Sequence, residues 1–153
     1  MATNNIINND NPNLLFAFTN NASPVANATG DGTWNIALWD TAWKGTIITS
    51  NGWTVTTAGY YLIGWNVNLT GLTSSHVLGV TGLHLSGSGW GTEVYTNPYS
   101  LSTGGSAVLS NTCICQMAVG DQIWINVAVS GGSLVVNIAN STAETVFYGL
   151  LIA

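Results

Sequence analysis

Basic side chains are almost absent from this 153-residue sequence, in which Lys44 is the one Lys or Arg against six Asp and Glu residues. Charged residues of both signs make up only 5% of the chain, so Asn, Thr, Ser and Gly must supply most of its polar surface. A protein that binds phosphate backbones or anionic lipid headgroups needs a patch of Lys and Arg. The composition therefore argues against nucleic acid and against a membrane as partners.

A long apolar run is missing as well. No stretch approaches the roughly 20 apolar residues that a membrane-spanning helix needs. The first residues, MATNNIINNDNPN, also lack the basic start and the continuous apolar segment of a secretory signal. We therefore expect a soluble protein that is made in the cytoplasm of its host.

Helical periodicity is absent too, because Gly, Asn, Thr and Ser interrupt the apolar residues at short intervals. Hydrophobic residues nevertheless make up 46% of the chain, which excludes a disordered protein and allows one folded core. This combination is typical of an all-β protein with short strands and many turns. We predict an antiparallel β-sandwich of two sheets in residues 14–153, preceded by a polar N-terminal arm in residues 1–13.

Alternation of apolar and polar residues identifies the strands. Within residues 53–71, the odd-numbered residues from Tyr61 to Leu69 form a core face, and the even-numbered residues from Tyr60 to Asn68 form a second face that is half apolar. Residues 119–138 predict a tight turn, a strand, a reversal at two glycines and another strand. Residues 20–35 predict a long loop.

The last ten residues, ETVFYGLLIA, are apolar on both faces when read as a strand. Phe147 and Leu151 share one face, whereas Tyr148 lies on the other. One face can fill the core, but the other would leave an exposed apolar patch, which usually marks an interface. The segments around Tyr60 and Trp124 show the same property, so we predict that all three lie in one sheet whose outer side is buried by self-association. Scattered surface aromatics are the alternative for Trp124 and Tyr148.

No residue pattern for catalysis, metal binding or a cofactor is present. Cys113 and Cys115 share one face of a predicted strand, so we interpret them as buried free thiols rather than as a disulfide. His76 and His84 lie in a different segment, and no Cys or His cluster has metal-ligand spacing. The acidic residues lie in apparent loops without a diagnostic pair, and no nucleophile motif accompanies them. We predict a non-enzymatic protein.

Three segments, taken in order, resemble the tumour necrosis factor and complement component one-q superfamily of trimeric jelly rolls. AGYYLIGWNVNL resembles the Gly-x-Tyr strand of that family, here Gly59 to Leu69. MAVGDQIWINV is similar to its Leu-x-x-Gly-Asp-x-Val-Trp strand, and VFYGLLIA resembles its closing Phe-x-Gly-x-Leu strand. The matching positions are Met117, Gly120, Asp121, Ile123 and Trp124 in the second segment, and Phe147, Gly149 and Leu151 in the third.

The resemblance spans roughly residues 14–153 and implies a ten-stranded sandwich that assembles as a homotrimer, with the last strand central in the inner sheet. The trimer contacts that it implies are Tyr60, Leu62, Trp124, Tyr148 and Leu150. Animal members of the family carry a signal peptide and often a collagen-like stalk, and neither is found in this sequence. The calcium-binding carboxylates of some members match no motif here, so the resemblance implies no metal.

Two functions remain open. The first is a structural virion protein, namely a trimeric capsid decoration or cement protein of a bacteriophage, located on the virion surface and bound to a major capsid protein or another particle protein. Its arm would dock on the shell through Asn4, Asn5, Ile6 and Ile7. The scarcity of charge favours this function, because a neutral surface rich in hydrogen-bonding groups can bind neutral protein surfaces with little dependence on salt.

The alternative is an adhesive knob that binds a glycan or a receptor, such as a fibre tip or a lectin-like trimer. An exposed Trp beside Asp, Asn or Thr suits stacking on sugars and hydrogen bonding to their hydroxyls. The candidate residues are Trp39, Asp40, Trp43 and Trp90. The same tryptophans are also explained if they pack inside the sandwich.

Overall fold

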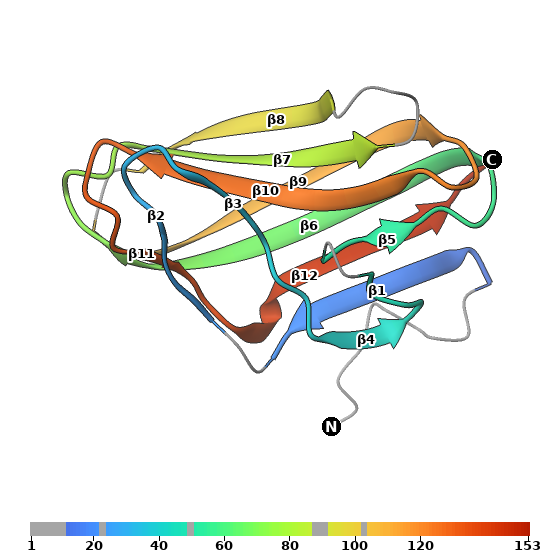
Figure 1. Ribbon diagram of the computed structural model, residues 1–153, viewed down its shortest axis with the longest axis horizontal. Helices are drawn as coiled ribbons and strands as arrows, with labels where there is room; N and C mark the ends of the chain where they lie inside the picture. The colour runs from blue at the N-terminus through green and yellow to red at the C-terminus, as the bar shows by residue number, and fades with distance from the viewer. Residues whose placement is uncertain (1–11, 22–23, 49–50, 87–91, 102–103) are drawn as a thin grey trace.

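A computed structural model of the protein describes residues 12–21, 24–48, 51–86, 92–101 and 104–153, with the backbone alone described at 86, 92–100, 142 and 143. Two antiparallel sheets pack face to face (Figure 1), which confirms the predicted all-β sandwich. Sheet A contains β1 (Leu14–Asn20), β2 (Val25–Thr29), β4 (Thr41–Lys44), β6 (Gly59–Leu72), β9 (Gly105–Met117), β11 (Val136–Ile138) and β12 (Ser141–Leu151). Sheet B contains β3 (Trp34–Ile36), β5 (Trp53–Thr54), β7 (Leu78–Ser86), β8 (Thr92–Ser100) and β10 (Gln122–Ser130).

The long strand β6 organises sheet A. It pairs with β9 along one side and with β12 and β11 along the other. Beyond β12 the sheet continues through β1 to β4, and β2 flanks β11. In sheet B, β10 pairs with β7, which pairs with β8, while β3 and β5 lie along the other side of β10.

The apolar tail forms β12, a central strand of sheet A, as predicted. It pairs with β6 on one side and with β1 on the other, where Phe147 faces Phe18. The ladder continues past the strand, since the Ile152 N–H donates to the Tyr60 carbonyl at 2.8 Å. Backbone hydrogen bonds on both sides therefore hold the tail in place.

The core lies between the two sheets and consists of their inward-facing residues. On β6 these are the odd-numbered residues from Tyr61 to Leu69, and on β10 those from Ile123 to Val129, all at most 1% exposed. The ring of Phe16 lies in the middle of an aromatic group, with its centroid 4.7 Å from those of both Trp53 and Phe147. Alternation in the sequence thus identified both core faces.

Residues 53–71 are not one strand, contrary to the prediction. Trp53 and Thr54 form β5 in sheet B, and the chain then crosses to sheet A, where β6 begins at Gly59. The apolar residues on both sides of the crossing face the same core, so the alternating pattern continues and hides the change of sheet.

The predicted loop at residues 20–35 is also partly wrong, because it contains β2 and the start of β3. Val25 is the one large apolar residue in the VANAT sequence of β2. The segment forms a strand because β11 offers a pairing edge, with Val136 opposite Thr29. The described residues contain twelve strands, whereas the resemblance implied ten; the additional ones are short.

The predicted turns are present. Gly120 has a φ of 93°, and the Asp121 N–H donates to the Ala118 carbonyl at 3.2 Å. The carboxylate of Asp121 closes the same turn, since its Oδ2 accepts the Ala118 N–H at 2.8 Å. Gly131 has a φ of 97° and makes the reversal after β10, but the following strand, β11, belongs to the other sheet.

His76 ties together two loops at one end of the sandwich. Its side chain is buried, its Nδ1 accepts the Thr73 N–H at 2.8 Å, and its Nε2–H donates to the Ser133 carbonyl at 3.0 Å. A Cβ on Gly132 would lie 2.4 Å from Nε2, so only glycine lets the β10–β11 loop approach the ring. His76 therefore has a structural role, joining this loop to the β6–β7 loop.

His76→Ala is expected to lower the free energy of unfolding by about 2–4 kcal/mol, because it leaves a cavity and removes the hydrogen bonds that the imidazole makes to two backbone groups. Guanidinium unfolding followed by circular dichroism measures this loss, with all variants at the same protein concentration. His84→Ala is the control, since His84 is only half-buried. Equal losses in the two variants would contradict the structural role of His76.

Candidate functional site: an apolar face on sheet A

The outer side of sheet A carries a contiguous group of apolar side chains, here called the apolar face. Its members are Tyr60, Leu62, Ile114, Tyr148, Leu150 and Ile152. The strand register brings them together, since Leu62 on β6 lies between Ile114 on β9 and Leu150 on β12. Tyr60, Ile114 and Ile152 are 48%, 64% and 52% exposed, which is a large exposure for such side chains on one face.

The orientation of the apolar face is fixed by the core on the other side of the sheet. Tyr61 and Ile63, which alternate with Tyr60 and Leu62 on β6, are fully buried. A slip of one residue would move both of them into water, so the register is strongly specified. A shift in strand register that buried the apolar face would therefore expose the core residues to water.

Gly64 allows Tyr148 to lie close to the sheet. The two residues are opposite each other in the β6–β12 ladder, and a Cβ on Gly64 would lie 2.4 Å from both Cζ and Oη of Tyr148. Any larger residue at this position would push the phenol ring outward. The glycine thus keeps the apolar face flat around Tyr148, which favours close contact with a partner surface.

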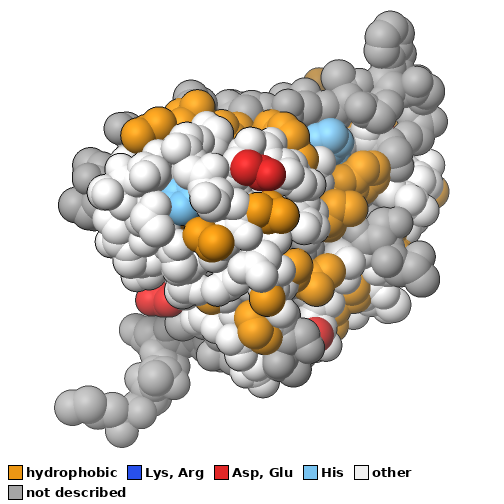
Figure 2. Space-filling view, turned by 60° about the vertical axis from the view of Figure 1, so that its left-hand side comes forward, with side chains coloured by type: hydrophobic (Ala, Val, Ile, Leu, Met, Phe, Trp, Pro, Cys, Tyr) orange, Lys and Arg blue, Asp and Glu red, His pale blue; other side chains and the backbone are white. Residues whose placement is uncertain are grey.

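Polar residues border the apolar face. Asn66 lies between Ser110 and Val146 in the register, and Asn68 Nδ2 donates to Glu144 Oε2 at 2.7 Å. The end of the sandwich that carries β2 and β11 is likewise poor in charge, with few acidic side chains and no basic one in view (Figure 2). A partner that binds the apolar face would therefore be held by apolar contact rather than by charge.

Strand β9 forms an open edge beside the apolar face. Among the described residues it pairs with β6 alone, so the other side of its 13-residue backbone is not part of a ladder. Ile114 and Val108 on this strand are 64% and 41% exposed. Long edges of this kind favour pairing or packing with another chain unless they are covered.

The structure brings together four of the five predicted trimer contacts, namely Tyr60, Leu62, Tyr148 and Leu150. Trp124 is not among them, so the prediction that the three segments share one sheet is wrong. Trp124 lies on β10 of sheet B, where its ring stacks on His84 with centroids 5.5 Å apart. Alternation shows that Trp124 points away from the core but not which sheet carries it. That the other four residues contact a second subunit stays a prediction.

Ile114 belongs to the apolar face but was not predicted as a contact. In the sequence it stands between Thr112 and Gln116, on a side of its strand that is polar apart from Val108. Two apolar residues six positions apart give no periodic signal, and only the register with Leu62 reveals the place of Ile114.

Of the residues predicted to bind a glycan or a receptor, the three that the structure describes lie in different environments. Trp39 is 3% exposed and packs on Phe147 with ring centroids 5.5 Å apart, so it fills the core and its prediction as a sugar-stacking residue is wrong. Asp40 Oδ1 accepts the Asn21 N–H at 2.8 Å, which fixes a loop. Trp43 is half-buried on β4. Trp90 and the arm residues Asn4, Asn5, Ile6 and Ile7 lie outside the described residues.

Groups suited to metal binding are scarce. The described part of the chain holds no group of three or more His, Cys, Asp or Glu side chains that could bind a metal ion. Cys113 and Cys115 are free thiols, as predicted. The hydrogen bond to Cys115 and burial raise the pKa of Cys113, and the same hydrogen bond lowers the pKa of Cys115. Within the same described ranges, no helix has the length and apolar character needed to cross a lipid bilayer.

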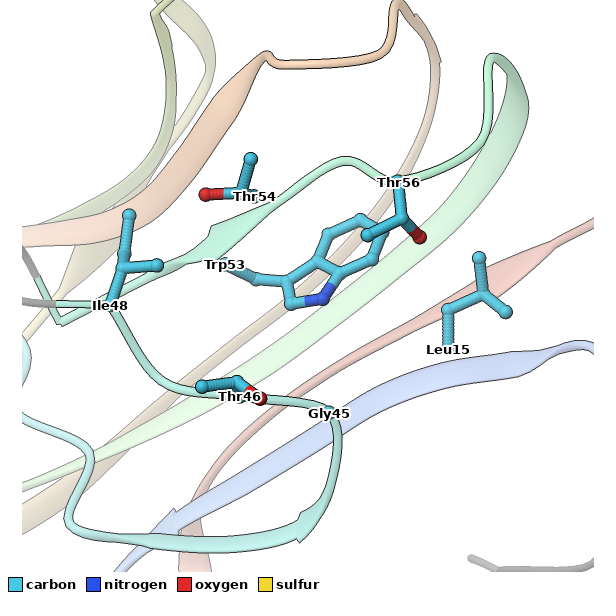
Figure 3. Close-up of a pocket in the computed structure, with 7 residues that line it drawn as sticks. All are labelled: Leu15, Gly45, Thr46, Ile48, Trp53, Thr54 and Thr56. Carbon is cyan, nitrogen blue, oxygen red and sulfur yellow. The ribbon is translucent and has the colours of Figure 1, made fainter.

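A shallow cavity of about 260 Å³ lies between β1 and the chain around β5 (Figure 3). Its lining consists of Leu15, Gly45, Thr46, Ile48, Trp53, Thr54 and Thr56. These residues include no acid, base or thiol, and the volume is below the range of most small-molecule sites, about 300–1,000 Å³. The cavity thus offers hydroxyl groups and apolar contact but no group that could act as a general acid or base.

The fold is shared with solved structures of distant sequence. A crystal structure of murine APRIL at pH 8.5 matches with a TM-score of 0.64 at 11% identity, over 91% of this chain and 98% of that one. The Eiger TNF of S. frugiperda matches with a TM-score of 0.63 at 12% identity, over 92% and 93% of the two chains. No family model matches the sequence, and no curated protein does. The structural matches confirm the tumour necrosis factor-like jelly roll, and at this identity they show the fold alone.

Proposed function

We propose that the protein is a non-enzymatic structural protein that assembles as a homotrimer through the apolar face of sheet A. The observation that carries this proposal is the exposure of Tyr60, Ile114 and Ile152 on one contiguous side of three adjacent strands. Water contact with such a patch is unfavourable, and burying it against another protein surface is the usual remedy.

Other copies of the same chain are the best occupants of the apolar face. The face has no charged member that would select a charged partner, and it is continuous with the open edge of β9, which a neighbouring subunit can cover. Threefold symmetry is the arrangement implied by the tumour necrosis factor resemblance. Closed symmetry is also the usual outcome for soluble homo-oligomers.

Within a virus particle, such a trimer would serve as a capsid decoration or cement protein. The low charge of the chain supports this role, since Lys44 is its one basic residue and its remaining polar surface can bind neutral protein surfaces through hydrogen bonds. The partner would then be the major capsid protein or another protein of the particle shell.

Two linked measurements test the proposal. Light scattering of the purified protein at micromolar concentration is expected to give three times the 16.0 kDa chain mass. Quantitative mass spectrometry of particles from its source is expected to give a copy number that approaches that of the major shell subunit. A monomer in the first measurement would contradict the assembly, and a handful of copies in the second would contradict the decoration role in favour of a fibre tip.

The alternative function, binding of a glycan or receptor, loses Trp39, which lies in the core, whereas Trp90 lies outside the described residues and stays a prediction.

A further inference from the structure

Two thiols, those of Cys113 and Cys115, lie side by side on the core side of β9. One residue of the strand separates them, and residues two positions apart share one face of a strand. In the ladder with β6 they lie opposite Ile63 and Tyr61, whose side chains are fully buried. Cys115 belongs to the core cluster, and Cys113 packs against it. Both thiols therefore point into the same part of the space between the two sheets.

The spacing of the two residues is too wide for a disulfide. Two steps along a strand span roughly 6.5 Å, and because the side chains stand nearly parallel, their Cβ atoms are separated by a similar distance. A disulfide needs Cβ atoms about 3.8 Å apart, around a sulfur–sulfur bond of about 2 Å. Closing that gap would bend the strand out of its ladder with β6. The pair therefore stays available as two thiols.

A single metal ion between the two sulfur atoms matches this spacing. A bond from a thiolate to a metal ion is about 2.3 Å long, so a linear sulfur–metal–sulfur bridge holds the sulfurs roughly 4.6 Å apart. This is about 2.5 Å more than in a disulfide, and it raises the Cβ separation from about 3.8 Å to roughly 6.3 Å. The thiols of Cys113 and Cys115 already hydrogen-bond to each other, so both side chains are turned toward the position of the bridge.

The number and type of ligands restrict the kind of metal ion. Structural zinc takes four ligands, whereas calcium and magnesium take oxygen ligands. Within the described ranges, no third His, Cys, Asp or Glu joins the two thiols to form a group that could hold a metal ion. Two thiolates alone suit a soft ion that accepts a linear pair of ligands, and among biological metals this is Cu(I). Because two ligands suffice, zinc-type spacing in the sequence is no guide to such a site.

The edge position of β9 gives a metal ion access to the pair. Among the described strands, β9 pairs with β6 alone. Cys113 is half-buried, whereas Cys115 is only 9% exposed. Cys113 can thus receive the ion from solvent, and Cys115 completes the bridge in apolar surroundings, which limit the access of water to the metal.

We propose that Cys113 and Cys115 bind one Cu(I) ion as a linear pair of thiolates. Two copper–sulfur bonds form and two S–H bonds break, and both protons pass to the solvent. Copper remains Cu(I), so the step consumes no oxidant and no reductant. Both ligands come from one strand and lie on the core side of sheet A, whereas the apolar face lies on its outer side. The site therefore does not rest on the trimer, and either proposal can fail without the other.

The test is an anaerobic titration of the reduced protein with Cu(I) held by the coloured chelator bicinchoninate, with and without an excess of glutathione. The wild type is compared with Cys113→Ser and Cys115→Ser. Cys113 is half-buried, so its variant keeps the fold even if Cys115→Ser disturbs the core. The matched control combines Cys113→Ser with Ile114→Cys. It keeps two thiols in the chain but moves one to the outer side of β9, where Ile114 is 64% exposed.

The expected result is one Cu(I) per chain, which the wild type retains against glutathione. Each Ser variant should bind about 100-fold more weakly or worse, because the second thiolate no longer acts at the high effective concentration that the strand provides. The relocated thiol should not restore the affinity. Four results would overturn the proposal: loss of Cu(I) from the wild type to glutathione, one Cu(I) shared by two chains, unchanged affinity in both Ser variants, and full affinity in the control with the relocated thiol.

Discussion

Leu62→Asp is expected to convert the trimer into monomers while leaving the fold of each chain intact. Leu62 lies between Ile114 and Leu150 in the middle of the apolar face. A carboxylate buried there without a partner costs several kcal/mol, and each 1.4 kcal/mol or so is a tenfold change, so association weakens about 10³-fold or more. In the monomer the same side chain is partly exposed and its carboxylate can be hydrated. Light scattering across a concentration series measures the shift.

The control for this substitution is Leu134→Asp, which places the same charge on the loop before β11. Leu134 is 43% exposed and lies outside the apolar face, so its variant should keep the wild-type mass. Circular dichroism confirms that both variants remain folded. A trimer that persists in Leu62→Asp would show that another surface holds the subunits together.

Phe147→Ala is expected to cost about 3–5 kcal/mol of the free energy of unfolding. Phe147 is fully buried, and its ring contacts those of Phe16 at 4.7 Å and Trp39 at 5.5 Å between centroids. These aromatic neighbours are too large and too tightly packed to fill the space that the phenyl ring leaves. Guanidinium unfolding in the monomeric Leu62→Asp background separates this loss from any change in assembly.

Tyr148→Ala provides the comparison, since Tyr148 is the next residue and points to the outer side of the same strand. In the monomeric background its expected cost is about 1 kcal/mol, because little packing is lost on a side that faces water. Comparable losses at the two positions would contradict the structure, in which Phe147 lies in the core and Tyr148 lies on the outer side of β12.

Alternation was enough to predict the two core faces, whereas the central position of the last strand was implied by the tumour necrosis factor resemblance. The faces from Tyr61 to Leu69 and from Ile123 to Val129 are fully buried as predicted, because a period of two is imposed by the backbone of every strand. Tyr60, Leu62 and Tyr148 came together for the same reason, as outward residues of strands that pair directly.

Sheet membership could not be predicted in this way. Trp124 and Tyr148 show the same alternation, yet one belongs to β10 of sheet B and the other to β12 of sheet A. The difference is set by which distant strand supplies the hydrogen bonds, and a local pattern has no information about that. The same limit concealed the crossing between Thr54 and Gly59, since both sheets point their apolar residues at one shared core.

Trp39 illustrates a second limit of the sequence. Its neighbours Asp40 and Thr41 suggested an exposed loop, and Asp40 is indeed exposed. Trp39 itself turns inward because Phe147, which comes from the other end of the sequence, offers an aromatic surface beneath it. A side chain at a strand boundary can point either way, and the choice depends on partners that the local sequence does not show.

The position of β12 between β1 and β6 has a consequence for biosynthesis. During translation the strands β1 and β6 leave the ribosome early, but the strand that joins them is made after all the others. Until residue 151 has emerged, the nascent chain carries two unsatisfied strand edges and the aromatic side chains that will become its core. Sheet A can therefore close only once β12 has left the ribosome, and until then its open strand edges and apolar side chains are exposed to aggregation.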